Sequence, residues 1–174
     1  MRRAPCAVRR GIIAPVEALP FIDEHAVPVD AAPERVWEAL VRVVRRSFGG
    51  AGRVAALLGC DPAVASPGFD GGEGQTLPGF RVAESVPGAR LALVGRHRFS
   101  RYSLTFVIED GRLRAETRAA FPGLAGRLYR AAVIGTRGHR LVTRRLLRAT
   151  AHLAQRPTPP GPGPSSGPAD PAAP

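Results

Sequence analysis

The Asp-Gly pair at Asp110 and Gly111 constrains this chain more than any other short motif, because the segments on either side of it match as two strands. Asp-Gly favours a two-residue type I′ turn, which fixes the residues that face each other. On one face the pairs are apolar or small: Ile108 with Leu113, Phe106 with Ala115 and Leu104 with Thr117. On the other face they are polar: Glu109 with Arg112, Thr105 with Glu116 and Ser103 with Arg118. The motif therefore predicts an antiparallel hairpin with one buried face and one solvated face.

Two further strands precede this hairpin, and alternation places their apolar residues on the same face. Pro87-Gly88 marks the turn between them, which puts Phe80 and Val82 on the inner side. A four-residue turn around Phe99-Ser100 would then place Leu91, Leu93, Gly95 and His97 beside Ile108, Phe106, Leu104 and Tyr102. With an opening strand over 21–29, the pattern predicts five strands, and residues 75–77 are a candidate for a sixth.

Helical spacing follows the opening strand and returns at the end of the domain. Pro33 suits a first helical turn, and Trp37, Leu40, Val41 and Val44 recur at helical spacing after it. A short helix is predicted over 52–59. After residue 123, steps of three and four connect Leu128, Ala131, Gly135, Gly138, Val142, Leu146, Ala149 and Leu153. The two glycines in this stripe allow either one kinked helix or a short helix followed by a longer one.

The ends of the chain differ in composition from its middle. Residues 156–174 are rich in proline and glycine and contain no large apolar residue, so we expect a disordered tail. Residues 1–18 are expected to form a flexible segment, although Ile12, Ile13 and Val16 could dock on the domain. The folding unit is therefore predicted over 19–155. Neither a signal peptide nor a membrane span is recognisable, and we expect a cytoplasmic protein.

The formal net charge is +11, and much of the excess is local: residues 124–155 contain seven arginines and no acidic residue. A basic face can hold nucleic-acid phosphates or an anionic membrane. Alternatively, it is a solvated face whose arginines extend over apolar surface. We favour the solvated face, because the usual nucleic-acid motifs and their interleaved aromatic residues are missing.

Two residue types are absent, and their absence excludes several chemistries. Without lysine there is no Schiff-base nucleophile and no P-loop, and without asparagine there is no Cys-His-Asn triad. Cys6 and Cys60 have no metal-ligand spacing, and no two histidines lie four residues apart. We therefore expect neither a metal nor a cofactor.

The predicted order is strand, helix, short helix, antiparallel meander and long C-terminal helix. This order resembles the START-like (SRPBCC) superfamily of lipid-transfer domains, Bet v 1-type allergens and polyketide cyclases. Residues 25–40 carry an opening strand and Pro-Glu-x-Val-Trp helix similar to those of that superfamily, read as HAVPVDAAPERVWEAL. Residues 95–102 and 146–148 sit where a cavity strand and the final helix would be. The resemblance covers about 21–155. It implies an α+β helix-grip fold, in which a curved antiparallel sheet wraps around the C-terminal helix and leaves a ligand cavity.

We predict the lining of that cavity from strand parity and helix spacing. His97 and Tyr102 are its polar candidates, since a neutral imidazole and a phenol can hydrogen-bond a ligand carbonyl or assist proton transfer. His139 with Arg137 could meet an anionic head group, and Gly138 would leave room for a ligand. The expected ligand-binding residues are Trp37, Phe80, Val82, Leu91, Leu93, His97, Tyr102, Leu104, Phe106, Tyr129, Gly138, His139, Val142 and Leu146.

Three functions are compatible with this pattern. The first is a module that binds a hydrophobic or amphipathic small molecule, lipid- or polyketide-like, without a cofactor. The second is an aromatase/cyclase-type enzyme in which His97 and Tyr102 act as acid–base or orienting groups. The third is an interaction module whose arginine-rich helix docks on nucleic acid or an anionic membrane. We favour the first and leave catalysis open, because no acidic pair faces the predicted cavity and Glu84 is the only candidate acid there.

Overall fold

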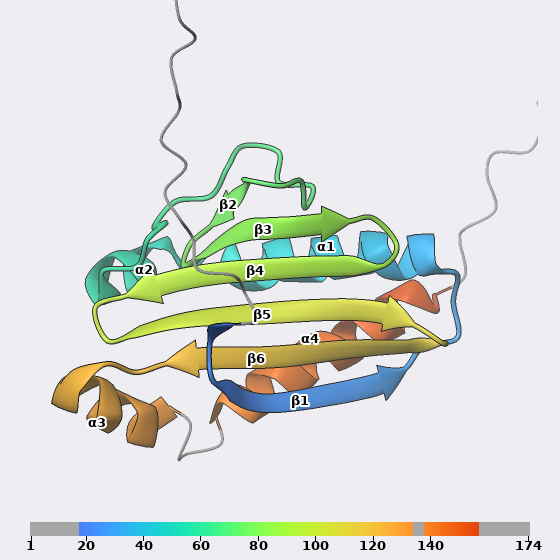
Figure 1. Cartoon of the computed structure of the whole chain (residues 1–174). Coiled ribbons are helices and arrows are strands. Elements are labelled where there is room, and N and C mark those ends of the chain that lie inside the picture. The colour runs from blue at the N-terminus through green and yellow to red at the C-terminus, as the bar shows by residue number, and fades with distance from the viewer. Residues whose placement is uncertain (1–17, 134–137, 157–174) are drawn as a thin grey trace, which may run out of the picture.

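The described residues of the computed structural model, 18–133 and 138–156, form one antiparallel sheet with helices on one face (Figure 1). The predicted N-terminal segment and tail lie almost wholly outside these residues, as do Gly135 and Arg137. The strands are β1 (Phe21–Pro28), β2 (Thr76–Leu77), β3 (Phe80–Val86), β4 (Arg90–His97), β5 (Ser100–Glu109) and β6 (Arg112–Ala120). The helices are α1 (Pro33–Phe48), α2 (Gly52–Leu58), α3 (Gly123–Val133) and α4 (Gly138–Ala154). None of these described helices is both long and apolar enough to cross a membrane.

The sheet runs in the order β1-β6-β5-β4-β3-β2, so the first strand of the chain pairs with the last. The hairpin of β5 and β6 has the predicted register at every pair, from Glu109 opposite Arg112 to Ser103 opposite Arg118. Asp110 has a φ of 49° and Gly111 a φ of 67°, which is the left-handed conformation that a type I′ turn needs at both central positions. Residues 76–77 supply the sixth strand that the sequence left as a candidate.

The turn between β4 and β5 is tighter than we predicted. It contains two residues, Arg98 and Phe99, so that His97 pairs with Ser100 and Gly95 pairs with Tyr102. The predicted four-residue turn is therefore wrong by two positions in register. The predicted inner face is nevertheless correct, because side chains alternate with a period of two and a shift of two residues preserves their side.

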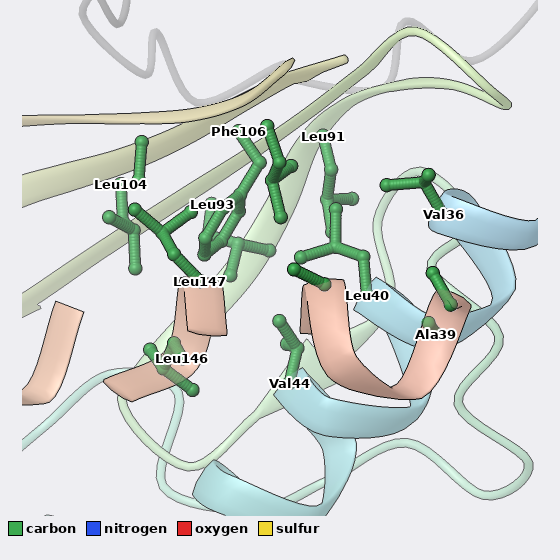
Figure 2. Close-up of a cluster of buried hydrophobic side chains, with 14 of the residues drawn as sticks. Val36, Ala39, Leu40, Val44, Leu91, Leu93, Leu104, Phe106, Leu146 and Leu147 are labelled. Atoms are coloured by element: carbon green, nitrogen blue, oxygen red, sulfur yellow. The ribbon is translucent and has the colours of Figure 1, made fainter. Parts of the chain in front are cut away.

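The core lies between this inner face and the helices α1 and α4, which pack against each other. Figure 2 shows side chains of both helices directed at strand residues, among them Leu40 from α1 and Leu147 from α4. Phe106 and Leu91 from the sheet have no exposed surface. α1 begins at Pro33, as the sequence predicts, and ends before Gly49. The hydrophobic contact between these two helices and the sheet therefore holds the layers together.

The C-terminal segment forms two helices, and the buried side of the second differs from the predicted stripe. Leu146 is buried as predicted, but Val142 is 53% exposed and Leu128 on α3 is 74% exposed. The buried side of α4 instead comprises Thr143, Leu146, Leu147, Thr150, Ala151 and Ala154. The Thr143 hydroxyl donates a hydrogen bond to the backbone carbonyl of His139 at 3.1 Å, whereas Thr150 Oγ1 is buried without a hydrogen bond to a described residue.

Candidate functional site

Aromatic rings gather where β4 turns into β5, at the end of the sheet that carries α2 and α3 (Figure 1). His97 lies among them, with its ring centroid 4.7 Å from that of Tyr129 on α3 and 5.6 Å from that of Tyr102 on β5. Successive ring contacts connect these three to four phenylalanines. We call the whole group the aromatic end: His97 with Phe48, Phe80, Phe99, Tyr102, Phe121 and Tyr129, which are six of the ten aromatic residues in the chain.

A buried glycine brings α3 close to this end. A Cβ atom on Gly126 would lie 2.8 Å from the carbonyl carbon of Phe121 and 3.0 Å from the carbonyl oxygen of Phe99. Only glycine therefore allows α3 to approach the β4–β5 turn this closely. The approach stacks the Tyr129 ring on the Phe99 ring, with 5.5 Å between centroids. Phe99 and Gly126 were not among the predicted site residues.

The imidazole of His97 has both ring nitrogens engaged within the protein. The backbone N–H of Phe99 donates to His97 Nδ1 at 3.1 Å, so this nitrogen is an acceptor. In the neutral ring the proton is then on Nε2, which lies 3.0 Å from the buried Ser100 Oγ and donates to it. Burial lowers the pKa of His97 and favours this neutral form. His97 therefore closes the turn and leaves part of its ring surface exposed.

The hydroxyl of Tyr102 is also used inside the protein. It donates a hydrogen bond to the backbone carbonyl of Gly79 at 2.8 Å. Burial raises the pKa of the Tyr102 phenol, and the neighbouring Cys60 thiol raises it further. A phenol held neutral and already hydrogen-bonded is a poor acid or base, and His97 is no better placed. The hydrogen-bonding groups of both residues that the sequence suggested for a cyclase-type role are thus engaged within the protein in this structure.

Apart from His139, the predicted lining residues fall into three groups according to their exposure. The first belongs to the closed core, where no side chain is more than 5% exposed: Val82, Leu91, Leu93, Leu104, Phe106 and Leu146. The second is half-buried: Phe80, Tyr102 and Tyr129 join His97 at the aromatic end, whereas Trp37 packs near Gly71. The third, Gly138 and Val142, is exposed on α4. Partly open surface with aromatic character is thus concentrated at the aromatic end.

A second polar group lies where the start of α4 meets β1. Asp23 is buried, and its carboxylate oxygens lie 3.5 Å from His139 Nε2 and 3.6 Å from His25 Nε2. His139 Nε2 is also 3.0 Å from Thr117 Oγ1. The charged group closest to His139 is thus a carboxylate of the protein itself. No cluster of three or more His, Cys, Asp or Glu among the described residues could hold a metal ion.

Asp23 is not among the predicted site residues, although the sequence carries a signal for it. Asp23, His25 and Val27 alternate along β1, and in a half-buried strand such residues share one face. Glu84, the acid that the sequence placed nearest to the cavity, instead accepts a hydrogen bond from Arg90 Nε at 2.8 Å and is partly exposed.

Two neutral histidines predict a loss of stability in mild acid. Burial lowers the pKa of both His97 and His139, whereas histidine in the unfolded chain titrates near its ordinary value of about 6.5. As the pH falls through that value, the unfolded state binds protons that the folded state excludes, so the free energy of unfolding decreases. The midpoint of urea unfolding should therefore be lower at about pH 5.5 than at about pH 7.5.

Replacing both residues, as His97→Gln with His139→Gln, should remove the part of this pH dependence that the two rings cause. His152→Gln is the matched control, because His152 is exposed at the end of α4 and should leave the dependence unchanged. A double variant that loses as much stability in acid as the unmodified protein would contradict the buried neutral state of the two rings.

The fold of this chain is similar to that of a solved structure. Protein CV1439 from Chromobacterium violaceum superposes with a TM-score of 0.51 at 15% sequence identity, over 79% of this chain and 100% of that chain. The chain has the helix-grip fold of START-like proteins. This confirms the fold predicted from the sequence.

Two further solved structures superpose less closely. The Aha1 dimer from Colwellia psychrerythraea gives a TM-score of 0.40 at 12% identity, over 74% of this chain and 94% of that one. CalU16 from Micromonospora echinospora gives a TM-score of 0.33 at 15% identity, over 76% of this chain and 81% of that chain. No protein-family model matches the sequence, and no curated protein matches it. A shared fold does not by itself specify a function, so the function follows from this chain's own residues.

Proposed function

We propose that the protein is a cytoplasmic carrier that binds an apolar or amphipathic small molecule at the aromatic end. The observation that carries this proposal is the contrast in burial. The core under α1 and α4 is closed, whereas His97, Phe99 and Tyr129 keep part of their ring surfaces exposed. Small-molecule sites are mostly apolar and aromatic, with a few polar groups that orient the ligand.

Tyr129 supplies the polar group in this proposal. Its hydroxyl has no hydrogen bond to any residue within 18–133 or 138–156, and burial raises its pKa, so it stays neutral. A neutral phenol both donates and accepts, which suits a carbonyl or hydroxyl on the ligand. The rings of His97 and Phe99 flank Tyr129 and would contact a flat apolar part of the same molecule. We therefore infer a ligand with a planar apolar body and one oxygen function.

Binding of the neutral fluorescent probe prodan tests the proposal. Prodan has a planar apolar body and a carbonyl, and its lack of charge removes attraction to the arginines. We expect saturable binding of one probe per chain, measured by fluorescence titration. Tyr129→Ala should weaken binding about tenfold, because it removes the central ring contact and the hydrogen bond together. Tyr129→Phe should weaken it less, by about fivefold or less.

Val86→Ala is the control for this titration. Val86 is exposed at the end of β3, away from the aromatic end, and its truncation should leave probe binding unchanged. Probe binding that does not saturate, or that Tyr129→Ala leaves unaltered, would contradict the proposed site.

The natural ligand needs a separate experiment. Native mass spectrometry of protein purified from its own host would identify a co-purified ligand by its mass.

A further inference from the structure

α3 and α4 carry positive charge without compensation. Neither helix contains an acidic residue, and six of their arginines are exposed: Arg127, Arg130, Arg140, Arg144, Arg145 and Arg148. Arg140 lies near a carboxylate, with its Nε 3.7 Å from Asp23 Oδ2. The other five make no ion pair with any residue that the structure describes. Because their charges are not neutralised locally, they attract an anionic partner.

The arginines of the strands are different. Arg90 pairs with Glu84 at 2.8 Å, and Arg114 pairs with Glu109 at 2.8 Å. Arg118 pairs with Glu116. With Arg96 and Asp61 included, four of the seven strand arginines pair with a carboxylate, whereas one of the six arginines on α3 and α4 lies near one. The other three strand arginines, Arg81, Arg101 and Arg112, are exposed and make no ion pair with a described residue. Unpaired positive charge is therefore denser on α3 and α4 than on the sheet.

Large apolar side chains are exposed among these arginines. Leu124 and Leu128 lie one turn apart on α3, and Leu141 and Val142 lie in the first turn of α4; the three leucines are at least 70% exposed. On α4, Leu141 shares the outward side with Arg144, Arg145 and Arg148, which follow at helical spacing. The sequence interpretation of a solvated arginine face explains the arginines but not these leucines, since clustered exposed apolar residues mark contact surfaces.

We propose that this surface, formed by Leu124, Leu128, Leu141, Val142 and the arginines of α3 and α4, binds an anionic membrane. The leucines would enter the boundary between head groups and acyl chains, and the guanidinium groups would contact lipid phosphates. Nucleic acid is a weaker match. Phosphate contacts would use the arginines alone, and the described residues of α3 and α4 include a single aromatic side chain, Tyr129, on which a base could stack.

The proposed membrane surface is separate from the proposed small-molecule site, but both include residues of α3. Leu124 and Leu128 lie on α3, which also carries Tyr129. Membrane contact through α3 would therefore bring the aromatic end next to the bilayer, where apolar molecules partition. The membrane experiment uses no small-molecule probe, so its outcome and that of the prodan titration can be distinguished.

Sedimentation of the full chain with vesicles tests the membrane surface. Vesicles of phosphatidylcholine alone are compared with vesicles that also contain about 30 mol% phosphatidylserine, in about 0.1 M salt. We expect at least about tenfold stronger partitioning onto the anionic vesicles. Two variants, Leu124→Ser with Leu128→Ser, and Arg144→Gln with Arg145→Gln and Arg148→Gln, should each weaken it about tenfold. All five side chains are exposed, so circular dichroism should show that the fold persists.

A charge-matched control separates a defined surface from general attraction. Arg81→Gln with Arg101→Gln and Arg112→Gln removes three exposed strand arginines and should weaken partitioning less than about twofold. Three results would overturn the proposal: equal partitioning onto both vesicles, an equal loss in this control, or full partitioning by the serine variant. Tighter binding to a DNA duplex at the same salt, unaffected by the serine substitutions, would overturn it in favour of nucleic acid.

Discussion

Gly95→Ala should lower the free energy of unfolding by at least about 3 kcal/mol, or prevent folding altogether. A Cβ atom on Gly95 would lie 1.9 Å from the carbonyl oxygen of Gly79 and 2.7 Å from Cε2 of Tyr102. Gly95 and Tyr102 are directly paired across β4 and β5, so the tyrosine ring covers the glycine. The Tyr102 hydroxyl in turn donates a hydrogen bond to the backbone carbonyl of Gly79. Neither the tyrosine nor Gly79 can move away from the new methyl group without breaking that hydrogen bond.

Urea unfolding followed by circular dichroism measures this effect, with Gly50→Ala as the control. A Cβ atom on Gly50 would meet no other atom within 4 Å, and its φ lies outside the left-handed region. Gly50→Ala should therefore change the free energy of unfolding by less than about 1 kcal/mol in either direction. If Gly95→Ala were as stable as the unmodified protein, the close packing of β4, Tyr102 and Gly79 described above would be wrong.

Leu147→Ala should cost about 2–5 kcal/mol of unfolding free energy, whereas Leu141→Ala should cost less than about 0.5 kcal/mol. Both leucines are on α4, so helix propensity changes equally in the two variants. Leu147 has no exposed surface and packs in the core, whereas Leu141 is 70% exposed. Truncating Leu147 removes buried apolar surface and leaves a cavity, and truncating Leu141 does neither.

The same unfolding measurement compares the two variants and determines which side of α4 faces the sheet. The stripe predicted from the sequence included Val142 and Ala149, and the structure buries Leu147 and Thr150 instead. Val142→Ala is therefore a useful third variant and should behave like Leu141→Ala. Equal losses of unfolding free energy in Leu141→Ala and Leu147→Ala would contradict the orientation of α4 described above.

Local chemistry explains which parts of the fold could be predicted. The β5–β6 register followed from Asp110-Gly111, because the left-handed turn conformation suits those two residues and the flanking faces agree with it. The β4–β5 register was wrong because Arg98-Phe99 carries no glycine, asparagine or aspartate that would indicate a two-residue turn. The fold survived the error because the inner face did not change.

Tertiary contacts decided what the sequence could not show. The buried side of α4 includes Thr143 and Thr150, and an apolar stripe cannot reveal buried threonines. Asp23 shares one face of β1 with His25 and Val27, but its burial depends on α4 packing over β1, which the alternation does not show. At the aromatic end, His97, Tyr102 and Tyr129 were identified singly, but the contact between them depends on α3 approaching through Gly126, which no periodicity indicates.

The pairing of β1 with β6 determines the order in which this domain can be completed. Phe21–Pro28 leaves the ribosome first, yet its partner Arg112–Ala120 and the covering helix α4 are synthesised near the end of the domain. Contacts so distant in sequence slow folding, because the loop between them must close before they form. During translation β1 is thus an unpaired edge, able to join another nascent chain. β1, the first strand to be synthesised, can therefore pair with β6 only after all the other strands have been made.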